Sequence, residues 1–229
     1  MALLLFLSLL GLASSSLVSI VTIDKPIAEY IALSSSVQGF CIESQFRFCQ
    51  ANFDEALGLP TTVTWKDAAL LLQTFQTYAD ANITKMKTLC SARAQFAQCL
   101  GTQYAECVSV RYLLGKDAAA FSAATTYVAS LSTLDFVCSK GIEEARNQHS
   151  CLKAVSGNSD YKACVSTFQS AIAGHPEKLC REVRNTGLCM HEVFTKTCQQ
   201  DSKAGWFGCQ SFSASFTETC SDRSYCALH

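Results

Sequence analysis

Fourteen cysteines, an even number, are the feature that most constrains how this 229-residue chain can fold. In a secreted chain, an even set of cysteines indicates disulfides, here up to seven of them. The alternative is a set of reduced or metal-binding cysteines in a cytosolic protein. No two cysteines are closer than six residues apart, however, and zinc ligands favour spacings of two to four residues. The cysteines expected to form bridges are Cys41, Cys49, Cys90, Cys99, Cys107, Cys138, Cys151, Cys164, Cys180, Cys189, Cys198, Cys209, Cys220 and Cys226.

The first residues, MALLLFLSLLGLASSS, are typical of a secretory signal peptide, with an apolar run followed by small residues. We assign residues 1–16 to it, with cleavage near Ala13-Ser14-Ser15 or one residue later. An uncleaved membrane anchor is the alternative, because weakly apolar residues continue to Ile23. The serine cluster interrupts the run of about 20 apolar residues that a span needs. We therefore expect a secreted, extracellular protein without a membrane span after cleavage.

Size and charge limit the kind of protein further. A mature chain of about 210 residues can bury a real core, so disulfides would supplement that core rather than replace it. Each bridge is expected to add about 2–4 kcal/mol to the free energy of unfolding. The formal net charge is −1, with both signs scattered along the chain, which argues against nucleic acid or an anionic membrane as the partner.

The composition favours an all-α fold, a disulfide-stapled helical bundle, because there are only three prolines and eleven glycines. Residues 64–90 are predicted to form one long helix, with Thr64 as N-cap and Asp67 completing a capping box. Apolar residues recur along it at spacings of three, four or seven, which predicts a buried stripe. The members of this stripe are Trp65, Ala68, Leu72, Phe75, Ala79 and Met86.

A second helix is predicted from Lys116 to Cys138. Its inner face is expected to carry Phe121, Ala124, Val128 and Leu131, although many serines and threonines weaken the pattern.

Two motifs return along the chain and suggest internal repeats. The tetrapeptide KDAA begins at Lys66 and again at Lys116, and each copy leads to a cysteine that opens a CS…AR…Q…CL motif. We predict tandem helical units with three cysteines each, although coincidence among alanine-rich helices is the alternative. A domain over 41–229 would follow an N-terminal segment, residues 17–40. Its possible units are 41–107, 108–164 and 165–229.

Helix geometry restricts the pairing of the cysteines. Cys180, Cys189 and Cys198 are nine residues apart, which is a rise of about 13 Å along one helix. A disulfide requires Cα atoms within about 7 Å of each other. Bridges must therefore join different helices or cross a turn, and we do not expect consecutive cysteines to pair throughout.

No catalytic, cofactor or metal site is predicted, and we do not expect an enzyme. The pair His191-Glu192 invites comparison with a zinc-protease HExxH helix, but Thr195 stands where the second histidine is required. The adjacent carboxylates Glu143 and Glu144 point in different directions on a helix. The GxSxG, GxxxxGK[ST] and GxGxxG motifs do not occur in the sequence.

One sequon, Asn82-Ile83-Thr84, makes Asn82 a candidate glycosylation site. Asn82 lies seven residues after Phe75 and hence near the predicted apolar stripe, so both occupancy and burial remain open.

The C-terminal half contains LCREVRNTGLCMHEVFTKTC, a C-x8-C-M-x7-C pattern followed shortly by Trp206 and Phe207. Together with CIESQFRFC at Cys41, it resembles a family of secreted, cysteine-rich helical domains known mainly from nematodes and of unknown function. The resemblance covers about residues 41–210 and implies secretion, disulfides and helices, with no catalytic residue. The stretch CLGTQYAECVSVRYLLG also resembles the helical cysteine-rich modules of the glial growth-factor receptors, which implies a protein partner.

Three functions are compatible with this sequence. The first is a secreted binding module for an extracellular protein, which an exposed apolar patch would favour. The second is an extracellular carrier of a small apolar ligand such as a lipid, which an enclosed apolar pocket would favour. An enzyme would need a convergent polar site. We expect the binding module.

Overall fold

The computed structural model describes residues 16–227, so all but the last residue of the predicted signal peptide lies outside the described residues. The α-helices are α1 (Lys25–Ser34), α2 (Glu43–Ala56), α3 (Ala68–Ala81), α4 (Ile83–Leu100), α5 (Tyr104–Cys107), α6 (Val110–Lys116), α7 (Phe121–Val137), α8 (Ile142–Asn147), α9 (His149–Val155), α10 (Ser159–Ile172), α11 (Leu179–Thr197) and α12 (Ser202–Ala214). Short 3₁₀ turns are η1 (Trp65–Asp67), η2 (Gly101–Gln103), η3 (Ala118–Ala120), η4 (Pro176–Lys178) and η5 (Ser224–Cys226). No strand occurs within residues 16–227, and the all-α prediction is confirmed.

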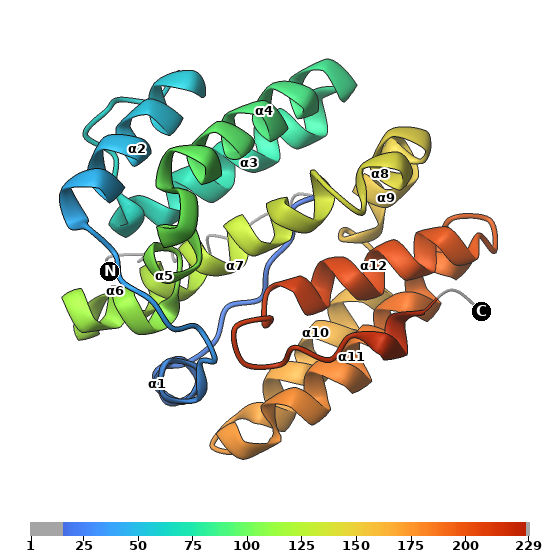
Figure 1. The fold of residues 1–229 in the computed structure, drawn as a ribbon. Coiled ribbons are helices and arrows are strands. Elements are labelled where there is room, and N and C mark those ends of the chain that lie inside the picture. Colours follow the sequence, from blue (N-terminus) through green and yellow to red (C-terminus); the bar gives the residue numbers. More distant parts are fainter. Residues whose placement is uncertain (1–15, 228–229) are drawn as a thin grey trace, which may run out of the picture.

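The serine- and threonine-rich segment after Lys116 forms α7, the central helix of the molecule. It packs against α3, α6 and α12 and is buried around most of its circumference (Figure 1). Small side chains allow neighbours to approach from several sides. Two of their hydroxyl groups bond within the helix: Thr125 Oγ1 donates to the Phe121 carbonyl at 2.9 Å and Ser130 Oγ to the Thr126 carbonyl at 2.6 Å. The Thr133 hydroxyl instead lies 3.1 Å from the Ser215 hydroxyl.

The prediction of one long helix over 64–90 is wrong, because the chain breaks at Asn82. The capping box at Thr64 is present: the Thr64 backbone N–H donates to Asp67 Oδ2 at 2.9 Å. Helix α3 then ends at Ala81, and Asn82 is extended with φ −173° and ψ 171°. Its Oδ1 accepts from the Lys85 N–H at 3.0 Å, so Asn82 is the N-cap of α4. The two helices pack against each other as a hairpin, and residues of the predicted stripe remain buried in both.

All fourteen cysteines are paired, as the sequence predicts. The bridges are Cys41–Cys107, Cys49–Cys99, Cys90–Cys138, Cys151–Cys198, Cys164–Cys189, Cys180–Cys220 and Cys209–Cys226. None joins two consecutive cysteines. The two cysteines within α11, Cys180 and Cys189, and Cys198 at its C-terminal end are bonded to the segment after α12, to α10 and to α9, respectively, as the geometric prediction requires.

The bridges divide the chain into two halves. The first six cysteines pair only among themselves within residues 41–138, and the last eight only within residues 151–226. The three-unit division that the motifs suggest stays a prediction, and one of its units, 108–164, contributes cysteines to both halves. Figure 1 shows α2, α3 and α4 on one side of α7 and α10, α11 and α12 on the other.

The segment that follows the predicted signal peptide lies between these halves (Figure 1). Leu17 and Val18 are buried, and the Leu17 N–H donates to Asp80 Oδ1 of α3 at 2.9 Å. From the other half, Gln169 Nε2 of α10 donates to the Thr22 carbonyl at 3.1 Å. The segment 17–40 therefore belongs to the packed core at its start. Among the helices described here, none has the length and apolar character to cross a membrane.

Candidate functional site

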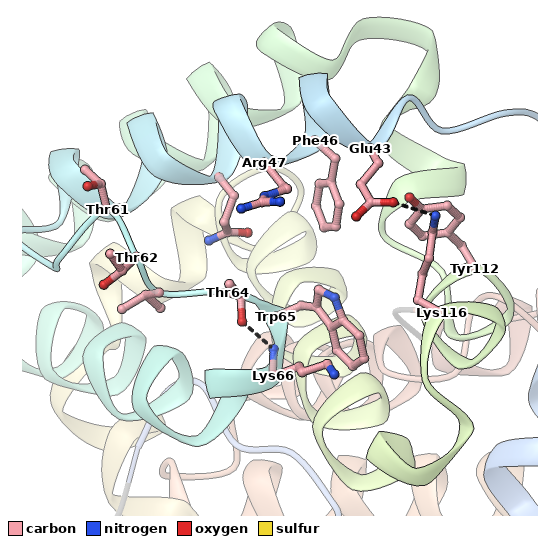
Figure 2. A pocket seen from close by; sticks show the side chains of 12 residues that line it. Glu43, Phe46, Arg47, Thr61, Thr62, Thr64, Trp65, Lys66, Tyr112 and Lys116 are labelled. Carbon is pink, nitrogen blue, oxygen red and sulfur yellow. Dashed lines mark hydrogen bonds and ion pairs between the residues drawn. The ribbon is translucent and has the colours of Figure 1, made fainter.

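A cleft of about 510 Å³ opens between α2, the chain that leads into η1, and the end of α6 (Figure 2). The residues that line it are Glu43, Phe46, Arg47, Gln50, Thr61, Thr62, Val63, Thr64, Trp65, Lys66, Tyr112 and Lys116. Its volume lies in the range of small-ligand sites, which is roughly 300–1,000 Å³.

One wall of the cleft is a single face of α2. Glu43, Phe46, Arg47 and Gln50 follow each other at intervals of three, one and three residues, so they project from the same side of the helix. The capped turn at Thr64 fixes the opposite wall. Figure 2 shows the Phe46 ring pointing from α2 toward Trp65, with the Arg47 side chain close beneath the same helix.

Aromatic rings provide the apolar surface of the cleft. Phe46 is buried, and its ring centroid lies 6.2 Å from that of Tyr112, in an edge-on arrangement. Trp65 is half-buried and faces the cleft from η1. Lysine ammonium groups lie over two of these rings, Lys66 Nζ at 5.5 Å from the Trp65 centroid and Lys116 Nζ at 5.2 Å from the Tyr112 centroid.

Three cations surround the cleft, and they differ in their partners. Lys116 Nζ lies 2.7 Å from Glu43 Oε2, and Lys66 Nζ lies 2.6 Å from Asp117 Oδ2. The hydrogen bond from Lys116 holds the pKa of the Glu43 carboxyl below its ordinary value. The guanidinium of Arg47 makes no ion pair or hydrogen bond with any residue from 16 to 227. Arg47 is therefore the cation that can receive an anionic group without breaking an existing pair.

The floor of the cleft leads to a buried polar chain. Gln50 is buried; its Nε2 donates to Asp54 Oδ1 at 2.8 Å, and its Oε1 accepts from the Tyr127 hydroxyl. Asp54 is fully buried, and its second oxygen has no partner among the described residues. Burial raises the pKa of Asp54 to about 7, against the hydrogen bond from Gln50, which lowers it.

The polar pairs noted in the sequence do not converge on a site. His191 is half-buried in α11 and packs against Gly205 of α12, while Glu192 is exposed. Glu143 is exposed and lies 3.5 Å from Arg146. Within the described part of the chain, no three histidine, cysteine or acidic side chains are grouped as a metal site requires. Asn82, the candidate glycosylation site, is exposed at the turn between α3 and α4.

Two spaces within the helical core have volumes of about 20 Å³ each. Each is large enough for about one water molecule and too small for a lipid. Two further hollows on the surface, of about 550 and 360 Å³, are shallower than the cleft.

The fold defines a class: an all-α protein held together by seven disulfides. Searches of protein-family models, of curated proteins and of solved structures found no match to this chain. The resemblance to the nematode-type cysteine-rich family therefore stays a prediction.

Sequence reasoning missed the cleft. The sequence places Trp65 in a core stripe, Lys116 in the repeated KDAA motif, and Phe46 and Arg47 in a cysteine-spacing motif. None of these patterns indicates a binding site. These residues come from three segments that only the fold brings together. The single usable signal was the spacing of Glu43, Phe46, Arg47 and Gln50, which is also the spacing of any helix face.

Proposed function

We propose that this protein is a secreted binding module that recognises an extracellular protein through the cleft between α2, η1 and α6. The recognised segment carries an acidic side chain beside an apolar one. One observation carries this proposal: the guanidinium of Arg47, which has no partner among residues 16–227, lies in a cleft whose other walls are Trp65, Phe46 and Tyr112. Aromatic residues and arginine are the residue types that dominate binding energy at protein interfaces.

Secretion is supported by the disulfides. The chain has seven disulfides. Disulfides persist in oxidising compartments and are rare in the cytosol. The apolar N-terminal run provides the expected route of export.

A binding role accords better with the cleft than catalysis does. Lys116 and Lys66 are each engaged by a carboxylate, and none of the described residues that line the cleft is a histidine or a free cysteine. The carrier alternative has less support, because a lipid requires an enclosed apolar cavity and the spaces within the core hold about 20 Å³.

Trp65 provides the readout for a direct test. The chain has two tryptophans, and Trp206 packs against Phe136 away from the cleft, so Trp206→Phe leaves Trp65 as the single reporter. We expect the blocked dipeptide acetyl-Leu-Asp-amide to change Trp65 emission with a dissociation constant in roughly the millimolar range. The neutral acetyl-Leu-Asn-amide is expected to bind about ten-fold more weakly, because it lacks the charge that pairs with Arg47.

Arg47→Gln should remove the difference between the two dipeptides, whereas Lys85→Gln, on α4 outside the cleft, should preserve it. Equal binding of both dipeptides to the protein with Arg47 would contradict the proposal. A small molecule that remains with the secreted protein in native mass spectrometry, and leaves on denaturation, would support the carrier instead.

A further inference from the structure

We propose that signal-peptide removal ends between Ser15 and Ser16, and that the new α-ammonium group of Ser16 is held between the two halves with Asp80 as its counter-ion. This inference rests on the secretion proposed above. A signal peptidase would hydrolyse the Ser15–Ser16 peptide bond with one water, leaving a carboxylate on Ser15 and an ammonium on Ser16.

The start of the described chain is already bonded to both halves. The Ser16 nitrogen donates to Ser156 Oγ at 2.7 Å, and the Leu17 nitrogen donates to Asp80 Oδ1 at 2.9 Å. Ser156 follows α9 in the second half, and Asp80 belongs to α3 in the first half. Successive backbone nitrogens are at most about 3.6 Å apart, which puts the Ser16 nitrogen within about 6.5 Å of the Asp80 carboxylate.

The surroundings of these two nitrogens favour a cation. Asp80 is the penultimate residue of α3, where the helix dipole is negative and an additional carboxylate is unfavourable without a positive partner. The neighbouring cation, Lys153, donates to the Asp80 backbone carbonyl at 3.0 Å rather than forming an ion pair with the carboxylate. His149 Nε2 lies 2.7 Å from the Ala79 carbonyl. Within residues 16–227, the Asp80 carboxylate makes no ion pair, so an ammonium at the start of the chain supplies the missing charge.

The assignment of residues 1–16 to the signal peptide would make Leu17 the first residue. We place the first residue one position earlier, at Ser16, because the groups of Ser16 are built into the core. Ser16 is 3% exposed, and its carbonyl accepts from Ser19 Oγ at 3.0 Å and from Ser156 Oγ at 3.2 Å. Its side-chain oxygen accepts from the Val18 N–H at 3.1 Å. Cleavage after Ser16 would remove all of these bonds and leave the buried hydroxyl of Ser156 without them.

The test begins with intact mass and N-terminal sequencing of the full chain after secretion from eukaryotic cells. The expected first residue is Ser16. The second measurement is the rate at which the folded protein reacts with an aldehyde reagent selective for α-amines. A paired and buried ammonium should react slowly, and Asp80→Asn should accelerate the reaction about ten-fold by removing the counter-ion. The matched control is Asp160→Asn, an exposed aspartate in the first turn of α10 that is paired with Lys196, which should leave the rate unchanged.

Each result decides between the proposals. Recovery of the protein with Met1 retained overturns the secretion proposal. Removal of the leader with any first residue other than Ser16 overturns this inference alone. An unchanged reaction rate in Asp80→Asn overturns the ion pair. If Asp80→Asn fails to be secreted, Asp80→Glu takes its place: it keeps the charge but displaces it, and an intermediate rate is expected, whereas the wild-type rate would count against the pair.

Discussion

The carboxyl group of Asp54 lies fully buried beneath the cleft, beside Gln50 and within the field of Asp67. Burial raises its pKa from the ordinary value of 3.8 to about 7. The folded chain therefore holds this proton more tightly than the unfolded chain. Between about pH 4 and pH 7, the contribution of Asp54 to the free energy of unfolding falls as the pH rises, and above pH 7 it is level.

Asp54→Asn should remove this contribution. The stability of the variant relative to wild type is expected to rise from pH 4 to pH 7, by about 4 kcal/mol at most, since one pKa unit corresponds to roughly 1.4 kcal/mol. Urea unfolding of the two oxidised proteins at pH 5 and pH 8 measures this difference in the free energy of unfolding. Asp160→Asn, at an exposed position, should show the same pH dependence of the free energy of unfolding as wild type. If the free energies of unfolding of Asp54→Asn and wild type change in parallel with pH, the pKa of Asp54 is not raised in the folded chain, and the prediction is wrong.

Gly205 allows α11 and α12 to pack closely. A Cβ atom at this position would lie 2.8 Å from the His191 carbonyl oxygen and would also overlap the Thr195 hydroxyl. We expect Gly205→Ala to lower the free energy of unfolding by about 1–3 kcal/mol, because the neighbouring atom is backbone and cannot move aside. Gly115→Ala in α6 is the control, since nothing lies within 4 Å of its added Cβ, and it should be neutral or slightly stabilising. Equal thermal midpoints for the two variants would contradict the close packing.

At the scale of the element, Asn82 has two separable roles. Its Oδ1 caps α4, and its exposed side chain lies in a sequon. Asn82→Ala should lower the free energy of unfolding of the unglycosylated protein by about 1 kcal/mol. Asn82→Asp should keep that stability, because aspartate is an equally good N-cap.

In protein secreted from eukaryotic cells, we expect Thr84→Ala to lose a glycan mass while the cap remains. An intact mass that is the same apart from the substitution itself would show that Asn82 is not glycosylated.

The helices illustrate what sequence reasoning can reach. Local chemistry sufficed for the capping box at Thr64, because all its atoms belong to four consecutive residues. The break at Asn82 was missed because α3 and α4 bury apolar faces that remain in register across it, so the periodicity continued through a turn. The central place of α7 could not be inferred either. Buried residues occur around most of α7 because neighbours pack on several of its sides. Amphipathic periodicity identifies only helices with one buried face.

For the whole molecule, composition and cysteine number predicted the class of fold, whereas tertiary contacts decide the rest. The sequence required bridges between different helices but left their partners open, because six or more cysteines permit many pairings. The fold resolves this into two sets joined by no bridge. Residues 16–24 lie between the halves, and α7 of the first half packs against α12 of the second. The cleft depends on the same convergence, since Arg47, Trp65 and Lys116 meet only when α2, η1 and α6 are in place.

The most direct measurement is a disulfide map of the protein recovered from the medium of secreting cells, obtained by mass spectrometry of non-reduced peptides. The structure predicts seven bridges and no free thiol, with every bridge inside either residues 41–138 or residues 151–226. A bridge that joins the two sets, or free cysteines in the secreted protein, would contradict this account of a disulfide-stapled extracellular module.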